Sequence, residues 1–228
     1  IEKKNLSLQV DFTISFLFPF PCVNGHNLIK CLVYMYCFPL IISAPSGGGK
    51  TSIVARLLED DGLSRVITAT TRAPRKGEID GKDYHFWSVR RFESAIKKGA
   101  MAEWAKVHVN YYGIPKSSLD KLIKAGKTPV LVIDVQGART VKKVYKRAVS
   151  IFITPSSFDE LKRRIISRDD GTTDIKVRLA SAKKELKCIK DYDYLVINDD
   201  FEKAVADCKA IIRAERLKVE RSTKKFKQ

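Results

Sequence analysis

A glycine-rich segment that ends in a lysine is the feature that most constrains what this chain can fold into. Residues 43–52 read Ser-Ala-Pro-Ser-Gly-Gly-Gly-Lys-Thr-Ser and separate an apolar run at 38–42 from a second run at 53–58. The first run is typical of a buried strand and the second of a helix. Strand, glycine loop and helix in that order predict a phosphate-binding P-loop and disfavour the alternative of an ordinary glycine-rich turn.

The chemistry of the segment supports this interpretation. Glycines adopt backbone conformations closed to other residues, so successive N–H groups can turn toward phosphate oxygens, and the start of the following helix adds partial positive charge. Lys50 is expected to reach the β- and γ-phosphates of a nucleotide, and the Thr51 hydroxyl to ligate Mg²⁺. Ala44 replaces the first glycine of the strict pattern, and we expect this smallest possible change to be tolerated. The predicted ATP site comprises Ala44, Pro45, Ser46, Gly47, Gly48, Gly49, Lys50, Thr51 and Ser52.

Length and composition limit the class of protein. A chain of 228 residues with 44% hydrophobic and 30% charged residues has room for one α/β domain and the composition of a soluble globular protein. Its net charge of +17 is compatible with a nucleic-acid surface or with a site for anionic nucleotides. Basic residues are scattered apart from a run at 213–227, which we interpret as a solvated helix end, so nucleotides are favoured and no nucleic-acid partner is expected.

Cysteine usage indicates a reducing compartment. Five cysteines at irregular spacing argue for reduced thiols in the cytoplasm rather than for a disulfide framework. A zinc site is the alternative for an N-terminal group that lacks the paired spacing of zinc ligands. That group consists of Cys22, His26, Cys31 and Cys37.

The N-terminal part of the chain, residues 1–34, differs from the rest. Its apolar stretch at 14–22 contains two prolines and is too short to span a bilayer, so no membrane association is expected. Met35 lies just before the P-loop strand. We hypothesise that the folded domain covers 35–220, that the preceding residues are a non-native or disordered extension, and that 221–228 form a basic tail.

Apolar patterns beyond the P-loop indicate alternating strands and helices. Strands are expected where the apolar run is continuous, and helices where apolar residues recur every three or four positions. The expected strands are 65–70, 128–134, 149–154 and 194–197, and the expected helices begin near 158, 175 and 201, the second of them running to 189.

A dense group of charged and aromatic residues lies at 70–86. It reads Thr-Thr-Arg-Ala-Pro-Arg-Lys-Gly-Glu-Ile-Asp-Gly-Lys-Asp-Tyr-His-Phe. Arg72 and Arg75 could clamp a phosphate, because the planar fork of a guanidinium group matches two phosphate oxygens. From the local pattern alone, a solvated basic loop is an equally good interpretation.

This segment closely resembles the nucleoside-monophosphate site of guanylate kinases, in which T-T-R-x-P-R-x-G-E-x-x-G-x-D-Y-x-F is characteristic. The similarity covers roughly residues 38–216. It continues in order through Glu-Trp-Ala at 103–105, Asn-Tyr-Tyr-Gly at 110–113, Ile-Asp-Val-Gln-Gly at 133–137 and Val-Ile-Asn-Asp-Asp at 196–200.

The resemblance implies a site for GMP. Arginines and tyrosines would hold its phosphate, and Glu103 would read its base. That role is chemically reasonable, because an ionised carboxylate only accepts hydrogen bonds and guanine presents two adjacent donors, N1–H and its amino group, whereas adenine does not. The implied GMP-binding residues are Thr68, Arg72, Arg75, Tyr84, Glu103, Tyr112 and Asp134.

Two positions depart from the family pattern. Ile114 stands where the family usually has a serine or threonine that bonds the guanine O6, and Val132 stands where many relatives carry an additional aspartate. At the end of that strand only Asp134 remains to interact with a Mg²⁺-bound water or with the nucleotides.

A polar segment near 164–178 resembles the family's lid, whose arginines approach the phosphates when the lid closes. With the P-loop lysine they form the implied catalytic set, which is Lys50, Arg72, Arg164, Arg168 and Arg178. From the residues alone, surface arginines paired with nearby aspartates at 169, 170 or 174 are favoured instead. Asn198, at the end of the last strand, matches a position where the family contacts the adenine side of ATP.

The sequence therefore predicts an α/β fold of the P-loop NTP hydrolase type, with three layers, a central parallel sheet, an inserted GMP-binding region at about 68–127 and the lid. The resemblance implies a guanylate kinase that transfers the ATP γ-phosphoryl group to GMP, or to dGMP, with Mg²⁺, in purine nucleotide metabolism. A non-catalytic guanylate-kinase-like module that binds phosphorylated peptides is the alternative, which the intact Gly49-Lys50-Thr51 disfavours. We expect a cytoplasmic monomer or weak homo-oligomer without membrane or nucleic-acid partners.

Overall fold

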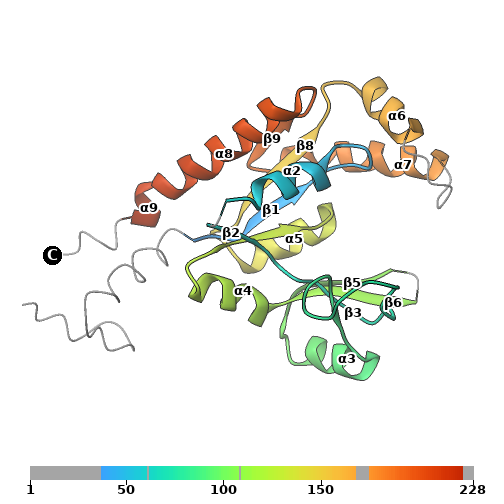
Figure 1. Ribbon diagram of the computed structural model, residues 1–228, viewed down its shortest axis with the longest axis vertical. Coiled ribbons are helices and arrows are strands. Elements are labelled where there is room, and N and C mark those ends of the chain that lie inside the picture. Colours follow the sequence, from blue (N-terminus) through green and yellow to red (C-terminus); the bar gives the residue numbers. More distant parts are fainter. Residues whose placement is uncertain (1–36, 61, 108, 168–174, 223–228) are drawn as a thin grey trace, which may run out of the picture.

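The computed structural model describes residues 37–60, 62–107, 109–167 and 175–222 (Figure 1). The hypothesised extension at 1–34 lies outside the described residues, and so do Arg168 and the end of the predicted basic tail. Of the N-terminal group considered as a zinc site, only Cys37 is described.

Five parallel strands form the central sheet, in the spatial order β2-β7-β1-β8-β9. The strand before the P-loop is therefore the middle strand, with two neighbours on each side. Their apolar runs are continuous because both faces of the sheet are covered. The strands are β1 (Leu40–Ser43), β2 (Leu63–Arg65), β7 (Thr128–Val132), β8 (Val149–Thr154) and β9 (Tyr194–Ile197).

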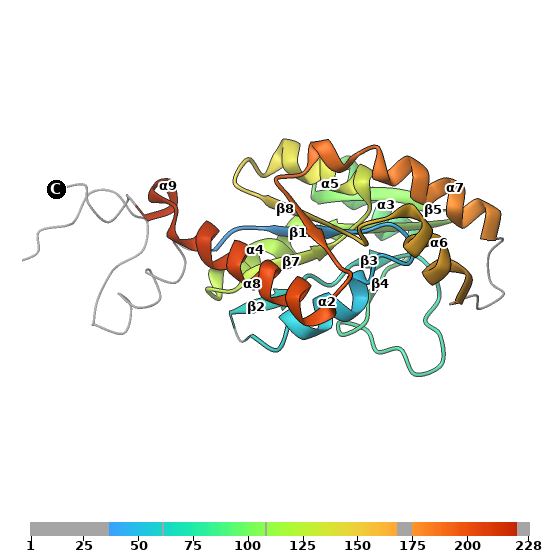
Figure 2. The ribbon, with the colours of Figure 1, turned by 90° about the horizontal axis from the view of Figure 1, so that it is seen from above.

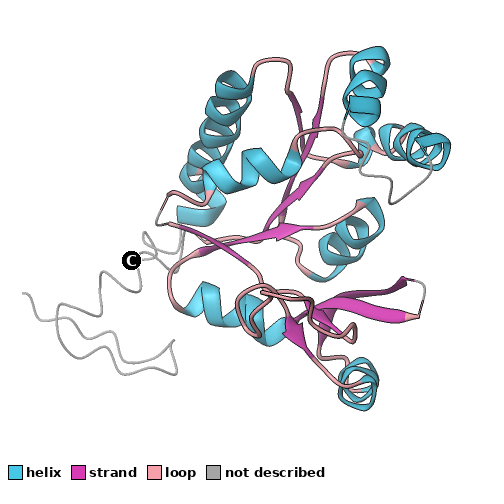
Figure 3. Ribbon diagram, turned by 45° about the vertical axis from the view of Figure 1, so that its right-hand side comes forward, coloured by secondary structure: helices cyan, strands magenta, loops and turns pink. Residues whose placement is uncertain are grey.

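Helices cover both faces of this sheet and complete three layers (Figure 2, Figure 3). Because successive side chains of a strand point to opposite faces, Leu40 and Ile42 pack in a core cluster with α2 and α8, and Ile41 packs in another cluster with α4 and α5. The predicted α/β fold with a central parallel sheet is confirmed. These helices are α2 (Lys50–Leu57), α4 (Lys116–Lys124), α5 (Val135–Val144) and α8 (Phe201–Leu217).

A smaller sheet, in the order β4-β3-β6-β5, occupies the region between residues 68 and 116. β6 is antiparallel to both of its neighbours, whereas β3 and β4 are parallel. On one face α3 buries Phe92, whose ring stacks on Tyr111 with centroids 5.2 Å apart. The elements are β3 (Ala69–Thr70), β4 (His85–Phe86), α3 (Val89–Lys97), β5 (Met101–Val107) and β6 (Asn110–Pro115).

The expectation of one strand at 65–70 is wrong. Its beginning belongs to β2 of the central sheet and its end to β3 of the smaller sheet. Between them the N–H of Val66 still donates to the carbonyl of Val130 (2.9 Å), after which the chain passes to the second sheet. An apolar, β-branched run indicates extended backbone but not which strand it pairs with, so the crossing could not be predicted from the pattern.

The helices α6 and α7, which include the ends of the predicted lid, form a small core of their own around Leu161, Ile165 and Ala182. The helix expected to run to 189 ends earlier, at Leu186, and Ile189 begins a short 3-10 turn. No helix among the described residues has the length and apolar character needed to cross a membrane. The remaining elements are α6 (Phe158–Ser167), α7 (Ile175–Leu186), η1 (Ile189–Asp191) and α9 (Val219–Ser222).

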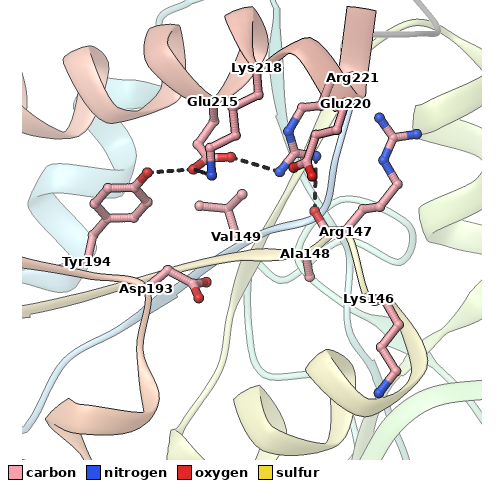
Figure 4. Close-up of a pocket in the computed structure, with 10 residues that line it drawn as sticks. All are labelled: Lys146, Arg147, Ala148, Val149, Asp193, Tyr194, Glu215, Lys218, Glu220 and Arg221. Atoms are coloured by element: carbon pink, nitrogen blue, oxygen red, sulfur yellow. Dashed lines mark hydrogen bonds and ion pairs between the residues drawn. The ribbon is translucent and has the colours of Figure 1, made fainter. Parts of the chain in front are cut away.

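The C-terminal helices are fixed to the sheet by a buried ionic network (Figure 4). Glu215 is 1% exposed, accepts a hydrogen bond from the Tyr194 hydroxyl (2.5 Å), and pairs with Lys218 (2.6 Å) and Arg221 (2.8 Å). The Arg221 guanidinium also lies 4.4 Å from the ring centroid of Phe38. The interpretation of the basic run at 213–227 as a solvated helix end is therefore wrong at Arg221, which is only 5% exposed.

A cavity of about 500 Å³ adjoins this network, with Val149 and Tyr194 in its wall (Figure 4). These two residues begin β8 and β9, whereas the P-loop follows the end of β1. Starts and ends of parallel strands lie at opposite edges of a sheet, so the cavity is at the edge away from the P-loop. Its most buried charged groups bond to one another, and we do not assign it as the nucleotide site.

Candidate nucleotide-binding site

The P-loop leaves the middle strand β1 and ends in the first turn of α2, as the sequence predicts. Gly47 and Gly49 have φ angles of 80° and 89°, a conformation that residues with side chains rarely adopt. A Cβ on Gly48 would lie 2.9 Å from the Cβ of Ala44. The loop has room for only one of these two methyl groups, so glycine at position 48 leaves the space that the Ala44 side chain occupies.

Lys50 is the first residue of α2 and is partly buried. Burial lowers the pKa of its ammonium group, and the carboxylates of Glu185 and Asp134 act in the opposite direction. Asp134 caps α5, with its Oδ1 accepting hydrogen bonds from the N–H groups of Gln136 (3.0 Å) and Gly137 (2.8 Å). Since β1 and β7 are neighbours, the lysine after one strand and the aspartate after the other belong to the same edge of the sheet.

Two of the predicted lid arginines contact the loop or its support. Arg178 donates from Nε and Nη2 to the Ser46 hydroxyl (3.3 and 3.2 Å), and its Nη1 is buried without a hydrogen-bond partner among the described residues. Arg164 donates to Glu160 (2.6 Å) and to the backbone carbonyl of Asn198 (2.9 Å). The aspartates considered as alternative partners at 169, 170 and 174 lie outside the described residues.

Asn198 lies against the P-loop. It is 5% exposed, and its amide nitrogen donates to the carbonyl oxygen of Gly48 (3.0 Å). The contact expected with the adenine side of ATP stays a prediction, whereas the contact observed is with the loop itself. Thr51 and Ser52, the other helical members of the predicted ATP site, are exposed on the first turn of α2.

Arg72 is at the centre of the predicted phosphate clamp for GMP. Its Nη2 contacts both carboxylate oxygens of Glu78 (2.8 and 3.0 Å), and its guanidinium carbon lies 5.5 Å from the ring centroid of Tyr84. The hydrogen bond with Glu78 is the largest cause that raises the pKa of Arg72, and a bond with the Tyr112 hydroxyl adds to it. Tyr84 and Tyr112 meet edge to face, with centroids 6.3 Å apart. The structure thus brings these three predicted residues together.

Two further predicted GMP-binding residues lie apart from this group: Arg75, predicted to bind the phosphate, and Thr68, predicted to lie near the guanine. Arg75 has an exposed side chain, and its backbone N–H donates to Glu78 (2.7 Å). Thr68 is partly buried, and its carbonyl accepts a hydrogen bond from the N–H of His85 (2.8 Å), which ties the start of β3 to β4. Among the described residues, neither the Arg75 nor the Thr68 side chain is hydrogen-bonded to Arg72.

Glu103, the predicted reader of guanine, lies on β5 against the start of α5. Burial, followed by the nearby charge of Asp134, raises the pKa of Glu103 to about 7. A Cβ on Gly137 would come within 3.2 Å of the Glu103 Oε2, so the glycine leaves space for the carboxyl group. A carboxyl group with a strongly raised pKa beside a second acidic side chain is characteristic of functional sites.

The two departures from the family pattern are apolar residues with apolar neighbours. Ile114 is 1% exposed and packs in the core cluster between the central sheet and α4. Val132 is partly buried and packs against the cluster that contains α2. A serine at position 114 of this chain would bury a hydroxyl group among apolar side chains, which costs free energy unless a partner is found.

Several contacts could not have been predicted from the sequence. Glu78 stands inside the quoted motif without an assigned role, and its acidic charge shortly after two arginines is the available signal. For Gly137 and Glu185 no local signal exists, because the groups they lie near, Glu103 and Lys50, are distant in the chain. The pair of Glu160 with Arg164 is four residues apart on one helix, and that spacing is itself a signal. Among the described residues, no group of three His, Cys, Asp or Glu side chains could hold a metal ion.

A parallel sheet with a P-loop after its middle strand, an acidic cap at the end of the neighbouring strand and helices on both faces define the class of P-loop nucleotide-binding α/β proteins. The family model described as guanylate kinase matches residues 36–215, well over half of the chain. The chain therefore belongs to the guanylate kinase family.

Similar proteins agree with this assignment. The chain is 44% identical over 180 residues to the guanylate kinase of Shewanella oneidensis, covering 78% of this chain and 87% of the relative. It is 45% identical over 182 residues to that of Wolbachia pipientis wMel, covering 78% and 90%. The crystal structure of guanylate kinase from Anaplasma phagocytophilum is similar with a TM-score of 0.64 at 34% identity, over 81% of this chain and 89% of that one.

Proposed function

We propose that this chain is an ATP:GMP phosphotransferase. The observation that carries the proposal is the position of Asp134. It follows β7, the neighbour of the P-loop strand β1, and a Cβ on Gly137 would meet both its Oδ1 (3.5 Å) and the Oε2 of Glu103 (3.2 Å). The predicted triphosphate loop and the predicted guanine-reading residue are therefore neighbours at one edge of the sheet. Membership of the guanylate kinase family supports the same reaction.

The reaction requires positioning and charge stabilisation rather than a covalent protein intermediate. The P-loop N–H groups and Lys50 would hold the ATP phosphates, while Arg72, Tyr84 and Tyr112 would hold the phosphate of GMP. The position of Arg178 favours binding of an anion close to the loop. Its Nε and Nη2 donate to the Ser46 hydroxyl, while its buried Nη1 lacks a partner among the described residues. With Arg164 it would offset the charge on the transferred group and exclude water.

Glu103 would select the base. When ionised it accepts hydrogen bonds from both guanine donors, and it offers no donor to the N1 of adenine. Burial already separates its carboxyl group from water. A base that leaves this group without a hydrogen-bond partner therefore binds less tightly by the desolvation cost of the carboxylate as well as by the missing hydrogen bonds. The predicted contact of Thr68 with the base is part of the proposal.

Mg²⁺ is the cofactor that the family implies, and the residues present fit it. Thr51 supplies an exposed hydroxyl directly after Lys50, and Asp134 uses only its Oδ1 in capping α5. Magnesium usually keeps several waters and needs few protein oxygens beside substrate phosphates, so a cluster of carboxylates is not required. When bound, the ion would neutralise phosphate charge, held by Thr51 and, through water, by Asp134.

The proposal includes the finer assignments of partners and setting. GMP and dGMP are the proposed acceptors, ATP the donor, and the enzyme is proposed to act in purine metabolism in the cytoplasm as a monomer or weak homo-oligomer. These assignments follow from the family and from the sequence, including the domain at 35–220 and the lid arginine Arg168.

A coupled ADP-release assay with ATP and Mg²⁺ tests the proposal. GMP, AMP, CMP and UMP are compared on the wild type, on Glu103→Ala and on Glu202→Ala, whose exposed side chain on α8 serves as the matched control. We expect turnover with GMP alone, largely lost in Glu103→Ala and unchanged in the control.

Each other outcome has a definite meaning. Equal turnover with AMP would overturn the role of Glu103 and leave the kinase assignment intact. Absence of turnover with every monophosphate would overturn the enzyme assignment and favour the non-catalytic module, which phosphopeptide binding at Arg72 would then reveal.

A further inference from the structure

Asn198, the residue after β9, is hydrogen-bonded to three other segments: the end of β8, the helix α6 and the P-loop. Its backbone N–H donates to the carbonyl of Thr154 at the end of β8 (2.9 Å), and its backbone carbonyl accepts from Arg164 of α6 (2.9 Å). Its side-chain amide donates to the carbonyl of Gly48 (3.0 Å). The residue is therefore held through its backbone N–H and its backbone carbonyl while its side chain bonds to the loop.

The bond to Gly48 fixes the direction of one peptide group in the loop. In a trans peptide the carbonyl of one residue and the N–H of the next point in opposite directions, and the described chain has no cis bonds. With the Gly48 carbonyl directed at Asn198, the N–H of Gly49 is directed the other way. Inward-facing N–H groups are what a P-loop uses to bind phosphate, so the bond favours the binding-competent loop.

The fit between Asn198 and the loop is close. A Cβ on Gly49 would lie 2.1 Å from the Asn198 Nδ2, closer than any non-bonded contact. Gly49 therefore has two reasons to be glycine, its left-handed φ of 89° and the asparagine beside it. The asparagine is 5% exposed, which leaves little of it for contact with a nucleoside.

We propose that Asn198 is a positioning residue that holds the P-loop in its phosphate-binding shape and does not select the adenine base. The inference rests on the proposed function, since it assumes that ATP is the ligand of the loop. It predicts that loss of Asn198 weakens binding of the phosphate chain, whatever base is attached. A direct contact with adenine would instead weaken only ligands that carry adenine.

Inorganic tripolyphosphate, the phosphate chain of ATP without its nucleoside, separates these two roles. Calorimetric titration measures Kd for ATP, tripolyphosphate and GMP in the presence of Mg²⁺. The variants are Asn198→Ala, which removes the donor, and Asn198→Asp, which also directs a carboxylate at the Gly48 carbonyl. Asp200→Asn is the matched control, because it changes the same turn and asparagine still caps α8.

We expect Kd for ATP and for tripolyphosphate to rise by the same factor, about five- to tenfold in Asn198→Ala and more in Asn198→Asp, as expected for a lost buried hydrogen bond. Kd for GMP should stay within about twofold in both, which shows that the variants fold, and the control should bind all three ligands as the wild type does. In turnover, KM for ATP should rise while KM for GMP does not.

Two results would overturn the inference, and they differ from failure of the proposed function. A loss confined to ATP, with tripolyphosphate binding intact, would show that Asn198 contacts the nucleoside. Unchanged affinity for both ligands would show that the loop does not depend on it. If the wild type itself bound neither ATP nor tripolyphosphate, the proposed function would fail and the positioning role with it.

Discussion

The ionisation of Glu103 should set the pH dependence of GMP binding. With a pKa of about 7, its carboxyl group is mostly neutral in mild acid and then donates where guanine also donates. Between pH values of about 8 and about 6 the ionised fraction falls about tenfold, and we expect Kd for GMP to rise by a similar factor. Calorimetric titration of GMP across this range, with ATP measured alongside, checks the prediction.

Glu103→Gln is the control for that experiment, because the phosphate of GMP also titrates near pH 6. Any pH dependence of Kd for GMP that remains in this variant comes from the phosphate group of the ligand. Identical profiles for wild type and variant would show that the carboxyl group does not titrate in this range.

The same pKa shift implies a cost in stability. A carboxyl group whose pKa is raised by folding stabilises the fold below the unfolded value of 4.5 and loses that contribution as the pH rises through about 7. Glu103→Gln should therefore raise the free energy of unfolding by roughly 3 kcal/mol near pH 8 and by only about 1 kcal/mol near pH 5. Urea unfolding at both values measures it, with the exposed Glu202→Gln expected to show no such dependence.

Glu78 should act on GMP through Arg72. Glutamine at this position keeps the size of the side chain but has only one acceptor oxygen and no charge, so one of the two bonds to Arg72 is lost. We expect Glu78→Gln to raise KM for GMP about five- to tenfold and to leave KM for ATP unchanged. Steady-state kinetics with each substrate varied measures both constants.

Asp83→Asn, in the same loop, is the matched control, because the Asp83 side chain accepts a hydrogen bond from the backbone N–H of Ile79 (2.8 Å) and asparagine can replace that bond. If both variants raised KM for GMP equally, the effect would belong to the loop and not to the arginine.

Motif chemistry predicts single residues well where their function is local. Lys50 could be predicted from the P-loop pattern, and the structure places it at the start of α2 as expected. Arg72, Tyr84 and Tyr112 were predicted to act together and do lie together. The bond between Asn198 and Gly48 joins positions 150 residues apart, and no pattern in the sequence states such a pairing.

At the scale of elements, strand type was easier to predict than strand partners. Continuous apolar runs gave β1, β7, β8 and β9 close to their observed bounds, because strands buried on both faces leave that pattern. The run at 65–70 was divided between two sheets, and the smaller sheet was not foreseen. Its strands β3 and β4 have only two residues each, too short for an alternating pattern.

The attachment of α9 should depend on the buried charge of Glu215. Burial acts to raise the pKa of Glu215, but hydrogen bonds from Lys218, Tyr194 and Arg221 outweigh it and keep the group ionised. Glu215→Gln leaves the buried Arg221 without a counter-ion, and we expect the free energy of unfolding to fall by about 3 kcal/mol. Urea unfolding measures the loss, and KM for both nucleotides should not change because the network is at the far edge of the sheet.

Glu220→Gln is the control, since Glu220 lies in α9 beside Arg221 and is exposed. A loss of similar size in both variants would mean that any change in α9 destabilises the chain. A marked rise in KM for Glu215→Gln would mean that the two edges of the sheet are coupled.

At the scale of the whole molecule, the two sheets carry the two proposed half-sites. The central sheet carries the P-loop and Asp134, and the smaller sheet carries Arg72 and Glu103. The two are linked by the extended segment between β2 and β3 and by the packing of α5 on β5. The charged groups proposed to act in phosphoryl transfer are therefore held by separate structural units, and the predicted lid arginines Arg164 and Arg178 come from a third, the helices α6 and α7.

This arrangement predicts that both nucleotides together close the molecule more than either one alone. A compound that joins adenosine and guanosine through five phosphates would contact the P-loop, the Arg72 cluster and the arginines of α6 and α7 at once, so its binding energy favours the closed state by differential affinity. Small-angle X-ray scattering should show a smaller radius of gyration with this compound than with ATP or with GMP. Lys50→Met, which weakens the ATP half, should reduce the response, whereas Glu202→Gln should not. An unchanged radius with the compound shown to be bound would mean that the half-sites are already in place before substrates arrive, and that catalysis relies on a preformed site rather than on closure.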